Sequence, residues 1–390
     1  MRLASRMEKL GTETAFEVLA RARALEARGR DIVHLEIGEP DFDTPGHIVD
    51  AAIQALRAGY THYGPSGGLP ELRQAIAQWV AHSRGIPVAP EQVVVTPGAK
   101  PIMFFAILAL VEPGDEVIYP NPGFPIYESM INFVGAKPVP IRLREERGFG
   151  LDPQELAQLV SKRTKLIILN SPQNPTGGLL PLEDLQSIAA VVKQHDIMVL
   201  SDEIYSELRY EGQHHSIASL NGLANRTIIL DGFSKTYAMT GWRLGYGVMP
   251  LELALHLTRL MTNSASCTTT FVQKAGVHAL VSSQDCVAQM RKEFKARRDL
   301  IVGGLNNIPG VSCIKPQGAF YAFPNITRLG LSSEEVASRL LNEAGVAVLS
   351  GTAFGKFGEG YLRLSYANSQ ANIQKALERF DALVRCILRG

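Results

Sequence analysis

Polar side chains follow three short apolar runs of this chain. Asn170-Ser-Pro-Gln-Asn174 follows the first run, Ser201-Asp202-Glu203-Ile-Tyr205 the second, and Asp231-Gly-Phe-Ser-Lys235 the third. A lysine amine can act as a nucleophile or as a general base once it has lost its proton. A carboxylate pair at the end of a buried strand needs a partner or water. The three segments therefore supply the groups of a chemical site, provided that the fold brings them together.

Each segment also has a purely structural interpretation. The Asn-Pro and Gly-Gly pairs within residues 174–178 form turns in any fold. A single lysine is usually exposed. The order along the chain favours a site, because Lys235 lies just past a strand end, after Asp202 and before Arg243 of Met239-Thr-Gly-Trp-Arg243.

The apolar runs themselves predict a buried parallel sheet. Runs at 93–96, 116–119, 165–170, 197–201 and 227–231 have the β-branched composition of strands covered on both faces, and 244–248 predicts a further strand. Amphipathic stretches such as 181–195 separate them. This alternation predicts an α/β fold, with a mostly parallel sheet flanked by helices. Ligands of such sheets bind beyond the carboxyl ends of the strands.

A change of pattern near residue 285 predicts a second, smaller α/β domain. Residues 289–306 predict a long charged helix, 318–323, 345–349 and 361–365 predict strands, and 372–388 predicts a closing helix. We expect a helix at 14–29 and a strand at 32–37 to pack on this unit. The predicted organisation is an N-terminal arm of 1–13, a small domain of 14–47 and 285–390, and a large domain of 48–284.

Composition argues against several other classes of protein. Thirty-nine basic and thirty-eight acidic residues give a net charge of +1, which supports neither nucleic acid nor an anionic membrane as a partner. The four cysteines form no CxxC pair, so we expect reduced thiols and no metal site. The longest apolar run, 101–111, is too short to span a membrane, and the first residues lack the apolar core of a signal peptide. We therefore expect a cytoplasmic protein.

Eight motifs in order resemble those of one enzyme family. They are Gly38-Glu-Pro-Asp-Phe-Asp-Thr-Pro45, Tyr63-Gly-Pro-Ser-Gly-Gly68, Pro97-Gly-Ala-Lys100, Asn174-Pro-Thr-Gly177, Ser201-Asp-Glu-Ile-Tyr205, Ser234-Lys235, Thr240-Gly-Trp-Arg243 and Arg363-Leu-Ser-Tyr366. Over nearly its whole length the chain is similar to the class I/II aminotransferases of the aspartate aminotransferase superfamily, which are fold-type I pyridoxal phosphate enzymes. Within it, the chain resembles the bacterial branch of aspartate/prephenate-type and broad-specificity enzymes. The resemblance implies a seven-stranded large-domain sheet.

The resemblance implies a pyridoxal 5'-phosphate cofactor held by Lys235 as a Schiff base. Amino groups would move from an α-amino acid to a 2-oxo acid by a ping-pong route, with Lys235 shuttling the proton. Asp202 matches the carboxylate that faces the ring nitrogen, and Tyr205 and Asn174 match the donors to the ring 3-oxygen. A β-eliminating C–S lyase on the same fold is an alternative, because the same groups would serve it. A third hypothesis is a regulator that uses this fold to sense a ligand.

Other matched residues would hold the phosphate and the ring. Gly98, Ala99 and Lys100 lie at the predicted start of a helix, where backbone N–H groups favour anions. Arg243 matches the family's phosphate-binding arginine, and Phe124 matches the aromatic residue that stacks on the ring. Many relatives carry a phosphate-binding serine three residues before the lysine. This chain has Gly232 there, and Ser234 is the candidate replacement.

Substrate recognition is only partly implied by the resemblance. Arg363 matches the arginine that binds the substrate α-carboxylate, assisted by Gly38 and Asn174. Tyr63 matches a tyrosine that reaches the neighbouring subunit's cofactor, which implies a homodimer. Lys100 could meet a distal carboxylate, whereas Glu17 near the entrance would repel one. The amino donor, the 2-oxo acid acceptor and the pathway stay open.

Overall fold

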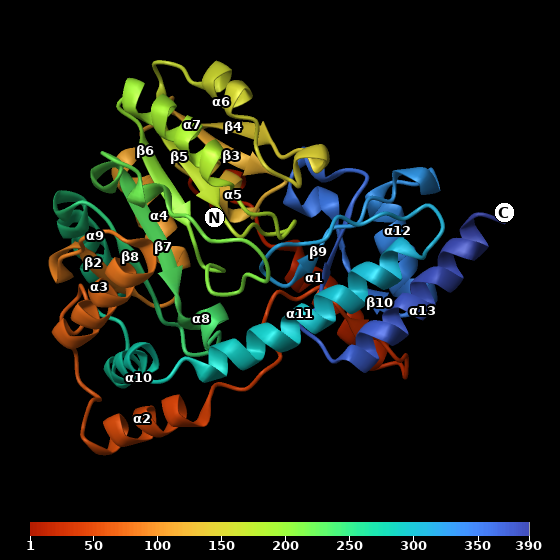
Figure 1. The fold of residues 1–390 in the computed structure, drawn as a ribbon, viewed down its shortest axis with the longest axis horizontal. Helices are drawn as coiled ribbons and strands as arrows, with labels where there is room; N and C mark the ends of the chain where they lie inside the picture. The colour runs from red at the N-terminus through yellow and green to blue at the C-terminus, as the bar shows by residue number, and fades with distance from the viewer. Residues whose placement is uncertain (390) are drawn as a thin grey trace.

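A seven-stranded sheet forms the centre of the larger lobe of the computed structural model, which describes residues 1–389 (Figure 1). Its strands are β2 (Val93–Thr96), β3 (Glu116–Asn121), β4 (Lys137–Arg142), β5 (Thr164–Asn170), β6 (Met198–Asp202), β7 (Thr227–Gly232) and β8 (Gly245–Val248). They lie in the order β2-β8-β7-β6-β5-β3-β4. All neighbours from β4 to β7 are parallel, and β8 is antiparallel to both β7 and β2. The predicted fold class is confirmed.

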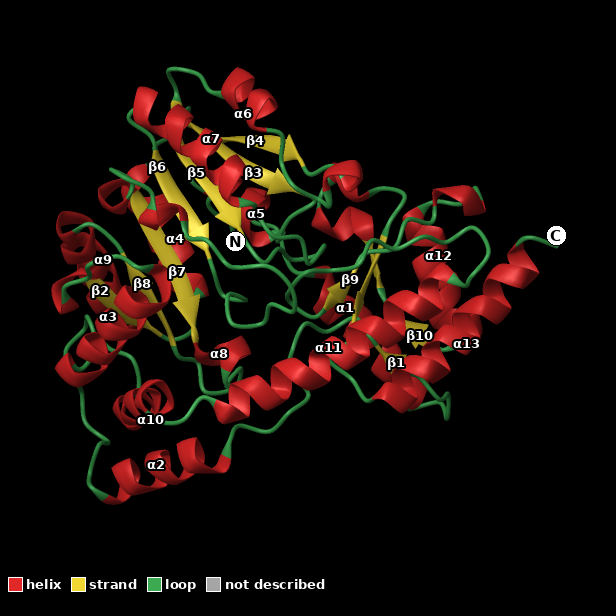
Figure 2. Cartoon of the chain, in the orientation of Figure 1, coloured by secondary structure: helices red, strands yellow, loops and turns green. Residues whose placement is uncertain are grey.

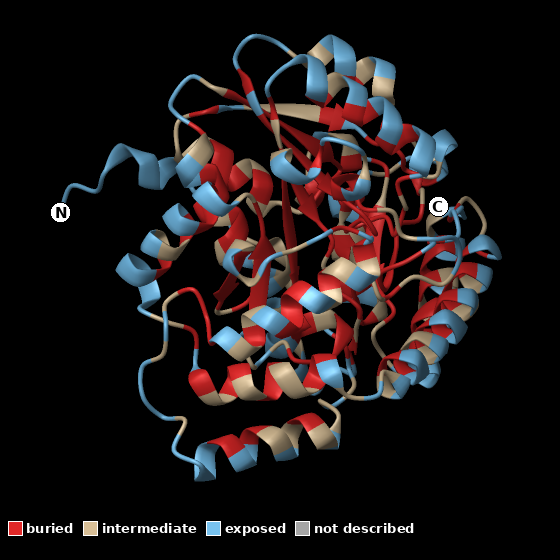
Figure 3. Cartoon of the chain, turned by 60° about the vertical axis from the view of Figure 1, so that its left-hand side comes forward, coloured by how far each residue is buried: buried red, intermediate tan, exposed pale blue. Residues whose placement is uncertain are grey.

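Helices cover both faces of this sheet (Figure 2), so its strands are buried on both sides (Figure 3). On β5, Leu166 and Ile168 join the apolar cluster that includes α4 (Lys100–Leu110), α5 (Ile126–Phe133) and α9 (Leu251–Ala265). Ile167 and Leu169 point to the opposite face, towards α6 (Pro153–Leu159) and α7 (Leu182–Gln194). The remaining large-lobe helices are α2 (Gly46–Arg57), α3 (Pro70–Arg84), the short α8 (Phe233–Thr236) and α10 (Thr270–Val281). Double coverage explains the continuous apolar runs.

The edge strand β4 was absent from the predicted set. Its sequence contains Pro138 and Pro140, which cannot donate to a ladder and are unusual in a strand. β4 pairs only with β3 and lies at the edge of the sheet, where missing donors are tolerated. The two prolines therefore argue against a strand in the sequence, although the edge position of β4 in the sheet allows one.

The smaller lobe is built from short strands and four helices, of which α11 and α13 are the longest. Strand β1 (Val33–His34) pairs in parallel with β10 (Val346–Ala347), while β12 (Leu362–Ser365) lies between β11 (Leu349–Ser350) and β9 (Tyr321–Ala322). The helices are α1 (Thr14–Glu26), α11 (Asp285–Asn306), α12 (Ser333–Arg339) and α13 (Gln370–Ile387). The strands are shorter than predicted, yet the pairing of β1 with β10 joins the N-terminal segment to this lobe as expected.

Hydrogen bonds join the two lobes close to the end of β3. The Gly123 amide donates to the Phe354 carbonyl at 2.8 Å, and the Phe357 amide donates to Asn121 Oδ1 at 3.0 Å. Glu145 accepts from the hydroxyl of Tyr361 at 2.7 Å. These contacts position β12 and its surroundings over the carboxyl ends of the parallel strands. Within residues 1–389, no helix is both long and apolar enough to cross a membrane.

Candidate active site

A cavity of about 460 Å³ lies where the parallel strands end and the two lobes meet. Its walls include most of the predicted site residues: Gly38, Ala99, Lys100, Phe124, Asn174, Asp202, Tyr205, Ser234, Lys235, Arg243 and Arg363. Gly98 does not line the cavity itself but lies directly beside Arg243, which does. Tyr63 does not line the cavity of the single chain, and 89% of its surface is exposed. Residues scattered over more than 300 positions of sequence therefore converge on one site.

Lys235 lies in the short helix α8 (Phe233–Thr236), which begins directly after β7. Its Nζ donates to the Gly38 carbonyl at 2.6 Å. Burial in the cavity lowers the pKa of Lys235 to about 8. A larger share of neutral amine is thus available near neutral pH than for an exposed lysine, as a nucleophile or proton acceptor requires.

Asp202 ends β6 and faces the same cavity. Its Oδ2 accepts from the Tyr127 hydroxyl, and its Oδ1 accepts from the Ile204 amide at 3.3 Å. Both donors are neutral, and burial raises the pKa of Asp202 to about 6. A buried carboxylate of this kind is suited to a cationic partner such as a protonated ring nitrogen.

Asn174 and Tyr205 present polar atoms on the neighbouring wall. Asn174 Oδ1 is buried and has no hydrogen-bond partner among residues 1–389. The hydroxyl of Tyr205 lies 2.7 Å from that of Tyr321. A side chain at Gly38 would come within 2.2 Å of the Tyr321 hydroxyl, so this glycine allows the Tyr321 ring to lie against the backbone at residue 38. The sequence predicted Tyr321 only as part of a strand, and only the fold reveals its place in the site.

The start of α4 provides a cradle for an anion. Gly98 has φ +85°, and a Cβ there would lie 2.2 Å from Arg243 Nη2. Arg243 is fixed by a 2.8 Å bond from Nη1 to the Thr240 carbonyl. The helix N-terminus, the guanidinium and the hydroxyl of Ser234 border the same cavity. Backbone N–H groups beside an arginine suit a phosphate group.

The departure at Gly232 has a packing reason in this structure. A Cβ at Gly232 would lie 3.0 Å from Gly245 Cα on the paired strand β8, and Gly245 in turn packs against Ala99. A serine there would crowd this contact. Ser234, two residues on and lining the cavity, is the hydroxyl that remains.

Arg363 on β12 is 4% exposed and points into the cavity. One of its Nη atoms donates to the Glu36 carbonyl, whereas its buried Nε has no partner in the described chain. The guanidinium lies 4.7 Å from the ring centroid of Tyr321 and 5.0 Å from that of Phe354. Burial lowers the pKa of Arg363. A buried cation with a free donor matches a carboxylate ligand.

The outer end of the cavity carries an ion pair. Lys100 Nζ contacts the Glu13 carboxylate and lies 5.3 Å from the ring centroid of Phe124. Glu13 lines the cavity beside Phe16, whereas Glu17 is exposed and does not line it. The structure thus gives Glu13 the place that the sequence suggested for Glu17. No pattern around Glu13 marks it, because its partner is 87 residues away.

Comparisons with known proteins agree with this arrangement. The family model for aminotransferase class I and II matches residues 30–380. An aspartate aminotransferase of Pyrococcus abyssi is 43% identical over 360 residues, covering 91% of this chain and 92% of that protein. The chain belongs to the class I and II aminotransferases. It is a pyridoxal 5'-phosphate-dependent enzyme that transfers amino groups between amino acids and 2-oxo acids.

Further relatives of this aminotransferase differ in their named substrates. An aromatic-amino-acid aminotransferase of Thermococcus litoralis is 40% identical, with 99% of each chain covered. The solved aspartate aminotransferase of Thermus thermophilus, described with maleate, superposes with a TM-score of 0.95 at 39% identity. That match covers 98% of this chain and 100% of the solved one. Family membership thus fixes the reaction but leaves the side chain of the donor open.

The cavity of the aminotransferase fits the cofactor that the family uses. Within the described residues Asp202 lacks a cationic partner, and the cradle at Gly98 faces an arginine. These are complements of a protonated ring nitrogen and a phosphate group. Within residues 1–389, no group of three or more His, Cys, Asp or Glu side chains is arranged to hold a metal ion.

Proposed function

We propose that the cavity around Lys235 is the active site and that Lys235 Nζ binds the cofactor and then moves the substrate proton. The convergence of Lys235, Asp202 and Arg363 on one cavity is the observation that carries this proposal, and the lowered pKa of Lys235 agrees with it, because a neutral amine is needed for both tasks. When bound, pyridoxal phosphate supplies an electron sink for the charge left at the substrate Cα. The Gly38 carbonyl accepts from Lys235 Nζ and fixes it within the cavity.

Asp202, Tyr205 and Asn174 would hold the ring of the cofactor. Asp202 would keep the ring nitrogen protonated, and Tyr127, a residue that the sequence did not suggest, orients the carboxylate through its hydroxyl. Tyr205 and Asn174 would donate to the ring 3-oxygen, and Phe124 would pack on the ring. Gly98, Ala99, Lys100, Ser234 and Arg243 would hold the phosphate through backbone N–H groups, a hydroxyl and a guanidinium.

Arg363 would bind the substrate α-carboxylate, with Gly38 and Asn174 beside it. For the side chain of the donor, we propose that the enzyme accepts both dicarboxylic and uncharged amino acids. Lys100 and Glu13 neutralise one another at the outer end of the cavity, so an uncharged side chain meets no net charge. A distal carboxylate can instead replace Glu13 as the partner of Lys100. The aspartate and aromatic names of the relatives support this breadth.

We further propose a homodimer in which Tyr63 contacts the cofactor of the other subunit. The exposure of its side chain in the single chain supports this role. The loop is braced, because Thr270 Oγ1 donates to the Tyr60 carbonyl at 2.9 Å. Sedimentation of the wild type and of Tyr63→Phe tests the assembly, since the variant should stay dimeric but lose cofactor affinity.

The division into an arm of 1–13, a small domain of 14–47 and 285–390, and a large domain of 48–284 is also a proposal. The pairing of β1 with β10 supports it, because it joins the two ends of the chain. We propose a cytoplasmic location as well, supported by four free cysteines. Limited proteolysis near residues 47 and 285 tests the boundaries, and cell fractionation tests the location.

The decisive experiment is borohydride reduction of the holoenzyme followed by peptide mapping. The cofactor should be found on Lys235, and labelling of another lysine would overturn the central assignment. A donor screen against 2-oxoglutarate, pyruvate and oxaloacetate then identifies the substrates and tests for a ping-pong pattern. The names of the relatives favour transfer over β-elimination. Release of pyruvate and ammonia from a cysteine conjugate would reverse that preference.

A further inference from the structure

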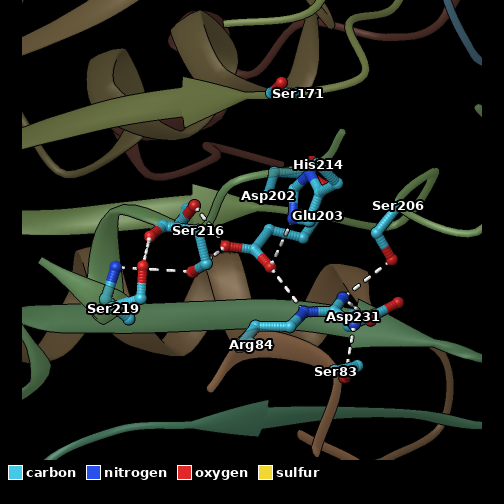
Figure 4. Close-up of polar contacts among 12 residues, drawn as sticks. Ser83, Arg84, Ser171, Asp202, Glu203, Ser206, His214, Ser216, Ser219 and Asp231 are labelled. Atoms are coloured by element: carbon cyan, nitrogen blue, oxygen red, sulfur yellow. Dashed lines mark hydrogen bonds and ion pairs between the residues drawn. The ribbon is translucent and has the colours of Figure 1, made fainter. Parts of the chain in front are cut away.

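A second group of charged side chains is buried next to the cavity but takes no part in its lining. Arg84 ends α3, Glu203 follows β6, and Asp231 lies in β7 (Figure 4). Their side chains are 1%, 1% and 5% exposed. Burying an arginine and two carboxylates is costly unless every charge has partners. Their arrangement therefore requires an explanation.

The guanidinium of Arg84 bridges separate parts of the large lobe. Its Nε donates to Glu203 Oε2 at 2.9 Å, and its Nη2 donates to Asp231 Oδ2 at 2.7 Å. Nη2 also donates to Ser206 Oγ at 2.7 Å, and Nη1 donates to Ser83 Oγ at 2.8 Å. One side chain thus ties the end of α3 to the ends of two neighbouring strands.

The carboxylates of Glu203 and Asp231 both accept hydrogen bonds from further donors. Glu203 accepts from Ser201 Oγ at 2.8 Å, from Ser216 Oγ at 2.6 Å and from His214 Nε2 at 3.0 Å. Although burial opposes it, the neighbours His214 and Arg84 lower the pKa of Glu203 to about 2. The carboxylate of Glu203 is therefore fixed from several sides.

Asp231 is held on both sides of its carboxylate as well. Its Oδ1 accepts from the Gly232 amide at 2.7 Å, and its Oδ2 accepts from the Tyr246 hydroxyl at 3.2 Å. Burial raises the pKa of Asp231 to about 7, against the effect of Arg84. The hydrogen bond from the Gly232 amide fixes the backbone at the residue before α8, the short helix that carries Lys235.

The cluster adjoins the two proposed catalytic side chains through the backbone. Glu203 directly follows Asp202, and consecutive residues at a strand end point to opposite sides. Asp202 is paired with Leu230, the residue before Asp231, in the register of β6 and β7. The bonds of Arg84 on one side of the sheet therefore fix the strand ends that present Asp202 and Lys235 on the other.

We propose that Arg84, through Glu203 and Asp231, is a positioning residue for amino-group transfer, setting the placement of Asp202 relative to Lys235. This inference rests on the roles proposed above for those two residues. Arg84 does not line the cavity, so it would not touch a substrate bound there. Its planar fork makes several bonds at once, so a lysine of equal charge cannot reproduce the bridge.

Arg298 offers a matched control. Its side chain is also fully buried, and it donates to the Pro316 carbonyl and to Glu211 at 3.0 Å each. It lies on α11 in the smaller lobe and lines no part of the cavity. If buried arginines only stabilise the fold, Arg84 and Arg298 variants should behave alike.

The test compares the holoenzymes of Arg84→Lys, Asp231→Asn and Arg298→Lys. Four quantities are measured: kcat, donor KM, the pH midpoint of the cofactor absorption band, and Tm of the cofactor-free protein. For the first two variants we expect kcat to fall about 10- to 100-fold, as for small misplacements of reacting groups, with donor KM within about threefold. Their absorption midpoint should shift. Arg298→Lys should lower Tm while leaving kcat and the midpoint unchanged.

A change in Tm alone for Arg84→Lys and Asp231→Asn, with kcat and the absorption midpoint as in the wild type, would overturn the inference. Should Arg84→Lys fail to fold, Asp231→Asn is decisive, because it removes a charge at nearly constant shape. Borohydride mapping on each variant separates this test from the proposed function. Labelling at Lys235 with an altered midpoint supports positioning, whereas labelling elsewhere would mean that the site itself was misassigned.

Discussion

Replacing Glu13 by Gln is expected to shift the aminotransferase towards dicarboxylic donors. In the structure the Glu13 carboxylate forms an ion pair with the Lys100 ammonium, so the distal carboxylate of a dicarboxylic donor must compete with Glu13 for it. The side chain of Lys100 is 50% exposed and that of Glu13 is 20% exposed, so solvent screens the pair. Pairs of this kind are worth about 0.2–1 kcal/mol, so kcat/KM for aspartate should rise about 1.5- to 5-fold.

Replacing Lys100 by Met has the opposite and larger effect on the same donor. Methionine keeps the length of the side chain and the backbone N–H at the start of α4, but removes the charge. Loss of a hydrogen bond to a charged group costs about 1.5–3 kcal/mol, or roughly 10- to 150-fold in kcat/KM for aspartate. An uncharged donor such as phenylalanine should change by no more than about threefold.

The double variant separates the two effects. In Lys100→Met the Glu13 carboxylate remains and repels a distal carboxylate, so adding Glu13→Gln should restore part of the aspartate activity. The assay is kcat/KM for aspartate and for phenylalanine, each with saturating 2-oxoglutarate. Glu17→Gln is the matched control, because Glu17 lies one turn further on α1, exposed and outside the cavity. Equal losses for both donors in Lys100→Met, or equal responses to Glu13→Gln and Glu17→Gln, would refute the reasoning.

Three further outcomes are expected. Lys235→Ala should fold but lose the cofactor's lysine-linked absorption band and about 10²–10⁴-fold or more of turnover, which spectra and single-turnover rates check. Asp202→Asn should still bind the cofactor yet lose about 10²–10³-fold in kcat, as on removal of a preorganised electrostatic contact, and full activity would mean a misassigned ring-nitrogen role. Burial lowers the pKa of His34, but bonds to Glu36 and Glu26 outweigh this and raise it overall. That stabilisation is present below the unfolded pKa of about 6.5 and lost as pH rises through the folded value, so His34→Gln should lower Tm more at about pH 5.5 than at about pH 8.5.

The sequence predicts well what depends on local pattern. The parallel strands that precede Asn174, Asp202 and Lys235 are visible as β-branched runs, and the rule for ligand sites in such sheets brings their ends together. The convergence of these three residues was thus predictable. β4 was not, because Pro138 and Pro140 disfavour a strand everywhere except at an edge.

Contacts between segments far apart in the chain could not be predicted from local sequence pattern. Tyr127 bonds Asp202 across 75 residues, and Glu13 meets Lys100 across 87. Nothing in the neighbourhood of either residue records its partner. The Arg84 cluster is similar, since a lone arginine at the end of a helix ordinarily indicates a solvated cation. Only the packing of α3 on the sheet buries it between two carboxylates.

The position of β2 at the sheet edge bears on how this protein is made. Within the described chain β2 pairs only with β8. The hydrogen bonds of β2, which include the pairing of Val93 with Val248, can therefore form only after β8 has been made. The turn at Gly98 that follows β2 is half of the phosphate cradle, and the other half, Arg243, lies just before β8. A nascent chain on the ribosome cannot assemble this cradle until both halves have emerged, because non-local pairings form late. The cofactor can therefore bind only after the chain has been made as far as β8, and by binding only the folded state it stabilises the pairing of β2 with β8.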